Sequence, residues 1–156
     1  EAVATAGFAC GPWLALSAGS RARLAAWCWE HRRSAADEEE AIAHYEAAAA
    51  AYEALGDGHG RLATCDALGF LHYQRREGDR AQHLEAALRC FQAGAGLVER
   101  EDQPGNWAAM QFNVGNAFLE RRIGDPLDSL DQAIAHLERA VAAQSKLGER
   151  GDSFSS

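Results

Sequence analysis

Cysteine, histidine and carboxylate side chains are the groups in this sequence that could bind a metal ion or take part in catalysis. Four cysteines and six histidines are spread along 156 residues. Cys28 and His31 have a helical i, i+3 spacing, and Cys65 and His72 lie two helical turns apart. A zinc site takes at least three protein ligands, and each of these pairs supplies only two. We therefore expect no bound metal and no cofactor.

The cysteines include no CxxC pair and do not form the dense pattern of a disulfide-linked domain. Free cysteines behave as small apolar residues and are buried in the packing between elements. Reduced thiols are typical of a cytoplasmic protein. We expect free thiols and a cytoplasmic location, the cysteines being Cys10, Cys28, Cys65 and Cys90.

Catalytic motifs are missing from the sequence. It contains no nucleophile elbow, no phosphate-binding loop and no HExxH pair. The acidic run 37–40 stands where a helix would begin, and negative charge is favourable in a first helical turn. We expect these carboxylates to be solvated, whereas a catalytic pair would be partly buried with shifted pKa values. The sequence predicts a protein that is not an enzyme.

The composition excludes two classes of partner. The net charge is −8 and Lys146 is the only lysine, whereas nucleic-acid binding requires clustered basic side chains. The same charge opposes adsorption to an anionic membrane. Alanine dominates the apolar residues and β-branched residues are scarce. Because alanine is the best helix former, the composition predicts an all-α fold.

Apolar periodicity and helix-end signals predict six helices in the chain. Ser34 and Asp37 are candidate N-caps, and Gly56 is a candidate C-cap for the second helix. Gly78-Asp79 and Gly124-Asp125 mark two further turns. The expected ranges are 21–33 (with a weaker pattern from residue 13), 38–55, 60–77, 80–100, 106–122 and 126–147.

The helices fall into three similar pairs. A shift of 46 residues aligns Gly69 with Gly115, and Arg75-Arg76 with Arg121-Arg122, without a gap. The same shift relates His44 to His136, with Cys90 between them, which explains these histidines as repeated positions without special chemistry. A fixed period of this length indicates a stacked helical repeat. The predicted repeat domain is 20–148, divided at about 57 and 103.

The two ends of the chain are expected to differ from the repeats. Residues 1–19 are irregular or belong to a partial preceding repeat, an interpretation we prefer to a targeting signal because they lack a basic segment and contain Gly7, Gly11 and Pro12. Residues 149–156 are expected to be a disordered tail.

The residues of the second and third pairs resemble tetratricopeptide (TPR) repeats. TPR repeats have a small residue near the middle of their first helix and an Ala-x3-aromatic/Leu-x2-Ala pattern on their second. The matching residues are Gly69, Ala87 and Phe91, and Gly115, Ala133, Leu137 and Ala140. The phrase beginning at Trp107 is similar to the longer bacterial repeats found beside CHAT domains or in multidomain signalling proteins. The resemblance implies a right-handed α-solenoid of three TPR-like hairpins.

The resemblance also implies where a partner would bind. In the family the first helices of the hairpins line a concave groove that holds a peptide or a partner helix. Asn113 and Asn116 match the two asparagines of the family's Asn-Leu-Gly-Asn phrase. Their amides would bond a peptide backbone; the alternative is that they face water. The other residues that the resemblance places on this wall are Trp27, Asp66, Phe70, Tyr73, Gln74, Phe112 and Glu120.

Two arginine pairs follow the first helices of the second and third repeats. Arg75-Arg76 and Arg121-Arg122 are expected in the last helical turn, where a cation stabilises the helix dipole. The alternative is that they bind an anion or an acidic peptide at the rim of the solenoid.

We therefore expect a non-catalytic interaction module, part of a larger signalling or regulatory protein, that binds a protein or peptide partner. The alternative is self-assembly into a homo-oligomer through the solenoid ends, because Leu130, Ile134, Leu137 and Val141 have no predicted helix to cover them.

Overall fold

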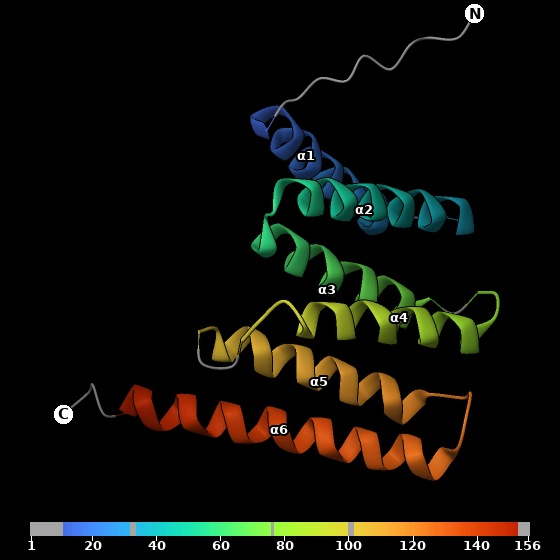
Figure 1. Ribbon diagram of the computed structural model, residues 1–156. Coiled ribbons are helices and arrows are strands. Elements are labelled where there is room, and N and C mark those ends of the chain that lie inside the picture. The colour runs from blue at the N-terminus through green and yellow to red at the C-terminus, as the bar shows by residue number, and fades with distance from the viewer. Residues whose placement is uncertain (1–10, 32–33, 76, 100–101, 153–156) are drawn as a thin grey trace, which may run out of the picture.

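The computed structural model describes residues 11–31, 34–75, 77–99 and 102–152, and within these ranges the protein is helical without strands (Figure 1). The all-α prediction is confirmed. The helices are α1 (Gly11–Glu30), α2 (Ala35–Leu55), α3 (Gly58–Gln74), α4 (Arg80–Ala95), α5 (Pro104–Glu120) and α6 (Pro126–Asp152).

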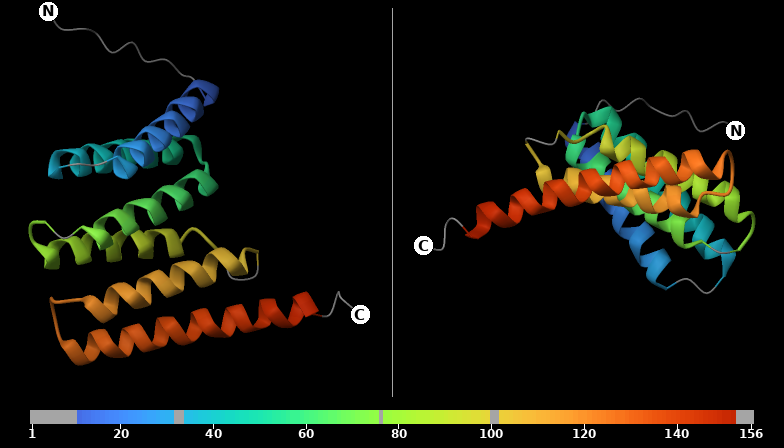
Figure 2. Two further views of the ribbon diagram at one scale, coloured as in Figure 1. Left: turned by 180° about the vertical axis from the view of Figure 1, so that it is seen from behind. Right: turned by 90° about the horizontal axis from the view of Figure 1, so that it is seen from below.

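The helices stack in the order of the chain. The closest pairs are α1 with α2, α3 with α4, and α5 with α6, and the links between the pairs are made by α2 with α3 and by α4 with α5. Consecutive helices run in alternating directions, and α6 lies at one end of the stack (Figures 1 and 2). Each internal helix therefore buries one side against its predecessor and another against its successor.

Local caps explain where α2 begins and ends. Ser34 accepts a hydrogen bond from the Asp37 amide while the Asp37 carboxylate accepts one from the Ser34 amide, which forms a complete capping box. Gly56 ends the helix in the left-handed region at φ 66°, where glycine carries no Cβ penalty. The assignments of Ser34 as N-cap and Gly56 as C-cap are confirmed, whereas Asp37, the other N-cap candidate, lies inside α2, which begins at Ala35 and not at 38 as expected.

Small residues set the spacing between paired helices. Ala41, Ala87 and Ala133 are each fully buried. At Gly69 an added Cβ would lie 2.4 Å from Cε1 of Phe91, and at Gly115 it would lie 2.7 Å from Cγ of Leu137. The aromatic or leucine side chain of one helix thus packs directly on the backbone of its partner, an approach that any larger residue would block.

Four internal helix ends differ from the sequence expectation, and the first is that of α1, which ends at Glu30 and not at 33. α3 ends at Gln74 and α5 at Glu120, so Arg75 and Arg121 follow the helices as C-caps and do not lie in the last turns. α4 ends at Ala95, earlier than expected, and Gly96 is its C-cap. Glycine is a poor helix former, and a helix interrupted by Gly94 and Gly96 gains little by continuing.

The outer ends of the chain are more helical than expected. α1 begins at Gly11, within the range predicted to be irregular or a partial repeat, and α6 continues to Asp152, within the predicted disordered tail. Gly148 does not stop α6, because a single glycine weakens a helix by only about 1 kcal/mol. The remaining parts of both predictions, residues 1–10 and 153–156, lie outside the described residues.

Candidate functional site

The predicted wall of the groove contains two hydrogen bonds between α3 and α5. Nδ2 of Asn113 donates to Oδ1 of Asp66 at 2.8 Å, and the Tyr73 hydroxyl donates to Oε1 of Glu120 at 2.5 Å. Asp66 and Tyr73 are seven residues apart on α3, as are Asn113 and Glu120 on α5, so both bonds lie on the same side of each helix. The structure therefore brings four predicted wall residues together.

The amide of Asn113 has a role that the sequence did not indicate. It was expected either to contact a peptide or to face water, but it bridges two helices at a half-buried position. Burial raises the pKa of Asp66, and the hydrogen bond from Asn113 opposes this effect. Asn113 thus supports the shape of the wall, and its contact with a peptide stays a prediction, as does that of Asn116.

Arg80, which sequence reasoning missed, contacts both partners of the hydrogen bond between Tyr73 and Glu120. Its Nη2 lies 2.5 Å from Oε2 of Glu120, and its Nη1 donates to the backbone oxygens of Tyr73 and Arg75 at 2.5 and 3.0 Å. Burial, followed by the hydrogen bond to Glu120 and its charge, raises the pKa of Tyr73 to about 12. A positive charge in the first turn of a helix interacts unfavourably with the helix dipole. The position of Arg80 at the start of α4 could therefore have indicated that its side chain makes another interaction.

A polar hollow opens beside these contacts, with a volume of about 860 Å³. It combines carboxylates, guanidinium groups and hydrogen-bonding side chains from the ends of four helices and the turns beside them. Four of its residues were predicted for the wall or the rim; Glu38, Glu77 and Arg80 were not. The lining consists of Glu38, Tyr73, Gln74, Glu77, Arg80, Glu120 and Arg122.

Large apolar side chains are exposed along α1, α3 and α5. They are between 44 and 57% exposed, whereas α2 and α4, which are described over their full lengths, carry no exposed side chain of this kind. We call this surface of the three helices the odd-helix face. Among the described side chains of these helices, its large exposed apolar residues are Leu24, Trp27, Phe70, Phe112 and Leu119. Three of them, Trp27, Phe70 and Phe112, were predicted from the sequence.

Two smaller hollows lie between the helices of the odd-helix face. One, of about 370 Å³, includes Ala22 and Ala26 of α1 and Ala63 and Ala67 of α3. The other, of about 230 Å³, lies between α3 and α5. They share the lining residues His59 and Ala63, so the two hollows are neighbours. Alanine in these hollows leaves room for a peptide backbone to approach closely.

Two of the four predicted rim arginines, Arg75 and Arg121, form ion pairs within the chain. Arg75 pairs with Glu38 at 3.4 Å and with Glu39, both in the first part of α2. Arg121 forms a bidentate ion pair with Glu85 of α4, with N–O distances of 2.7 and 3.4 Å. Each pair ties the end of one helix to the preceding hairpin. Arg122 is exposed in the polar hollow, and Arg76 lies outside the described residues.

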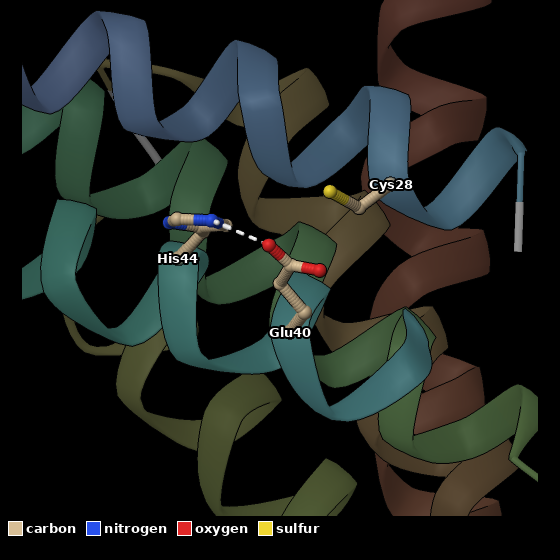
Figure 3. Close-up of side chains that lie close together, drawn as sticks. All are labelled: Cys28, Glu40 and His44. Carbon is tan, nitrogen blue, oxygen red and sulfur yellow. Dashed lines mark ion pairs between the residues drawn. The ribbon is translucent and has the colours of Figure 1, made fainter. Parts of the chain in front are cut away.

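A second cluster of functional groups lies between α1 and α2 (Figure 3). Sγ of Cys28 and the ligand atoms of Glu40 and His44 all lie within 4.8 Å of one another. Nε2 of His44 is 3.6 Å from Oε1 of Glu40. Sequence reasoning paired Cys28 with His31, but Nδ1 of His31 lies 2.9 Å from the backbone oxygen of Trp27. The i, i+4 spacing of Glu40 and His44 was the signal that could have found them.

The surroundings of Cys28 favour its protonated form. Burial raises the pKa of the thiol, and the carboxylates of Glu40 and Asp37 raise it further. The thiol is therefore a poor nucleophile unless a positive charge is added beside it.

No protein-family model, curated protein or solved structure matches the chain. Among the described helices, none combines the length and apolar character needed to cross a membrane.

Proposed function

We propose that this protein is a non-catalytic interaction module, a right-handed TPR-like α-solenoid that binds a peptide or a partner helix on its odd-helix face. The distribution of exposed apolar side chains carries the proposal. Between α1 and α5, Leu24, Trp27, Phe70, Phe112 and Leu119 are exposed while α2 and α4 expose none. Soluble proteins seldom expose a contiguous apolar surface without a binding role.

The contacts between hairpins support the repeat that the sequence suggested. Arg75 bonds Glu39 and Arg121 bonds Glu85, and each arginine follows its carboxylate partner by 36 residues. Both pairs connect the end of a first helix to the start of the second helix of the preceding hairpin. Identical spacing at two successive interfaces is the behaviour of a solenoid, in which each repeat contacts its neighbours in the same way.

The proposed binding surface combines apolar anchors on the odd-helix face with the polar hollow at the helix ends. Phe70 and Phe112 stand half exposed on neighbouring first helices and would receive apolar side chains of a ligand. The polar hollow contains both guanidinium and carboxylate groups of Arg80, Arg122 and Glu120, which suit the backbone and charged groups of a peptide. Aromatic residues and arginine are the residue types that contribute most to protein interfaces.

The proposal is tested by cross-linking and pull-down from the source cell, followed by affinity measurement with the recovered partner. We expect Phe70→Ala and Phe112→Ala each to weaken binding by about 5- to 30-fold, the equivalent of about 1–2 kcal/mol. Leu147→Ala on α6 is the matched control, because Leu147 is an exposed apolar side chain that belongs neither to this face nor to the residues considered for self-association. Equal affinity of all three variants would show that the odd-helix face is not the binding site.

The outer face of α6 favours a second candidate function, self-association. Leu127, Leu130, Ile134 and Val141 are 45 to 72% exposed on α6, the last described helix of the stack (Figure 1). Leu137, which was expected to be uncovered with them, packs on Gly115 of α5. Ile134 is the repeat equivalent of Leu88, which is buried among α5 residues. Sedimentation at increasing protein concentration tests this role. Growth in size that Ile134→Asp abolishes would support self-association, and a monomer at every concentration would exclude it.

We further propose a cytoplasmic location and a place within a larger signalling or regulatory protein. The location is supported by Cys28, Cys65 and Cys90, which are all free thiols. The place in a larger protein rests on the sequence resemblance alone.

A further inference from the structure

Cys28, Glu40 and His44 form a three-ligand cluster, and we propose that it binds a single Zn²⁺ ion or a similar divalent transition metal. The cluster is independent of the proposed binding groove, since none of the three side chains lines the hollows of the odd-helix face. Figure 3 shows the three side chains directed toward one another from two helices.

The distances fit a tetrahedral ion with small side-chain adjustments. Zinc bonds nitrogen and oxygen at about 2.0–2.2 Å and sulfur at about 2.3 Å, so its ligand atoms lie roughly 3.3–3.7 Å apart. Nε2 of His44 and Oε1 of Glu40 already lie 3.6 Å apart, and no pair in the cluster exceeds 4.8 Å. Glu40 is largely exposed, and its side chain can move toward the sulfur without disturbing the core.

The ligand types select the class of metal. A thiolate and an imidazole exclude Mg²⁺ and Ca²⁺, which require oxygen ligands. Sulfur, nitrogen and one carboxylate are the set that Zn²⁺ accepts, with a water molecule at the fourth position. The Cys28 thiol proton leaves to solvent as the sulfur bonds the ion.

The cluster is specific to the first hairpin. His136 occupies the position in α6 that His44 occupies in α2, but Nδ1 of His136 is 2.7 Å from Oε1 of Gln111 and its ring stacks on Phe118. The residue equivalent to Gln111 in the first hairpin is Gly19, which has no side chain to hold His44. His44 instead faces Glu40 and Cys28, so ordinary repeat packing does not explain the cluster.

Neighbouring ligand types are already engaged. The carboxylate of Asp37 accepts hydrogen bonds from Ser34, and the ring of His31 stacks on Trp27. Among the residues that the structure describes, the site therefore has three protein ligands. An ion there would link α1 to α2 and hold the helix that carries Trp27 against the rest of the stack.

The test is a titration of the metal-free, chelator-treated protein with Co²⁺, followed by displacement with Zn²⁺. We expect one ion per chain and a sulfur-to-cobalt charge-transfer absorption that Cys28→Ser removes. Glu40→Gln and His44→Gln each remove one metal ligand and should each weaken Co²⁺ binding by at least about tenfold. Zn²⁺ should also raise the Tm of the wild-type protein more than that of these variants.

The controls are Glu46→Gln on the same helix, His136→Gln at the equivalent repeat position, and Cys65→Ser with Cys90→Ser. All should bind Co²⁺ as the wild type does. The proposal is overturned if the wild type does not bind Co²⁺ saturably, or if Glu40→Gln and His44→Gln bind Co²⁺ as tightly as the wild type. It is also overturned if the Cys65→Ser and Cys90→Ser substitutions remove the cobalt–sulfur absorption. Because Glu40 is exposed, Glu40→Gln keeps the test valid even if Cys28→Ser disturbs folding.

Discussion

Replacing Gly69 with alanine tests the helix packing that underlies the fold. Gly69 lies in α3 against α4, and the added Cβ would stand 2.4, 2.5 and 2.9 Å from three ring carbons of Phe91. Contacts below 3.0 Å are essentially never found for a real Cβ. The Phe91 ring is 2% exposed and packs among buried side chains, so it has no free space into which to turn.

Two opposing effects set the size of the change. Alanine is favoured over glycine in a helix interior by about 1 kcal/mol. Forcing a methyl group into a packed core costs typically 1–3 kcal/mol, and the upper part of that range applies where three atoms of a rigid ring are too close. We expect Gly69→Ala to lower the free energy of unfolding by about 1–2 kcal/mol. For a domain of this size that lowers Tm by roughly 2–8 °C.

The measurement is urea unfolding followed by far-ultraviolet circular dichroism. Gly105→Ala is the matched control, because no atom lies within 4 Å of the added Cβ in the first turn of α5. This variant should be as stable as the wild type or more stable by up to about 1 kcal/mol. In the Gly69→Ala background, Phe91→Leu should cost less than it does alone, since the smaller side chain relieves the clash.

A Gly69→Ala variant as stable as Gly105→Ala would refute the packing described for α3 and α4. Additive effects of Gly69→Ala and Phe91→Leu would lead to the same conclusion, because they would show that the two residues do not touch.

Two further predictions concern ionisable groups. Burial lowers the pKa of His72 and His136, so the unfolded chain binds more protons than the folded chain near neutral pH. The free energy of unfolding should therefore decrease as the pH falls through about 6.5. Urea unfolding at pH ~7.5 and ~5.5 measures this decrease, and replacing both histidines by glutamine should make it smaller. Tyr73→Phe removes the hydroxyl bonded to Glu120 and should cost about 1 kcal/mol, whereas no change in the urea midpoint would mean that this bond does not form in solution.

Local chemistry explains what could be predicted about the elements. Ser34 as N-cap and Gly56 as C-cap depend on residues within one helical turn, and both predictions were correct, although the capping-box role of Asp37 was not predicted. The ends of α1 and α6 were wrong because weak helix signals near Gly11 and Gly148 were read as breaks. Whether a helix continues there depends on the summed helix propensities of all residues in the segment, so a single glycine does not decide it.

Part of the candidate site was also accessible from the sequence. The 46-residue shift and the TPR-like pattern placed Trp27, Phe70 and Phe112 on one wall, and all three side chains are exposed on the odd helices. The roles of Asn113 and Arg121 were not accessible, because each bonds a residue on another helix.

The sequence by itself determined the helices, some of their limits and the repeated small residues, because helix preference, capping and periodicity act over a few neighbouring residues. Only the tertiary structure decided which side chains meet. The bond between Tyr73 and Glu120 spans 47 residues, and the cluster of Cys28, Glu40 and His44 joins two helices. Such contacts depend on the rotation and spacing of packed helices, which are set by burial across the whole stack.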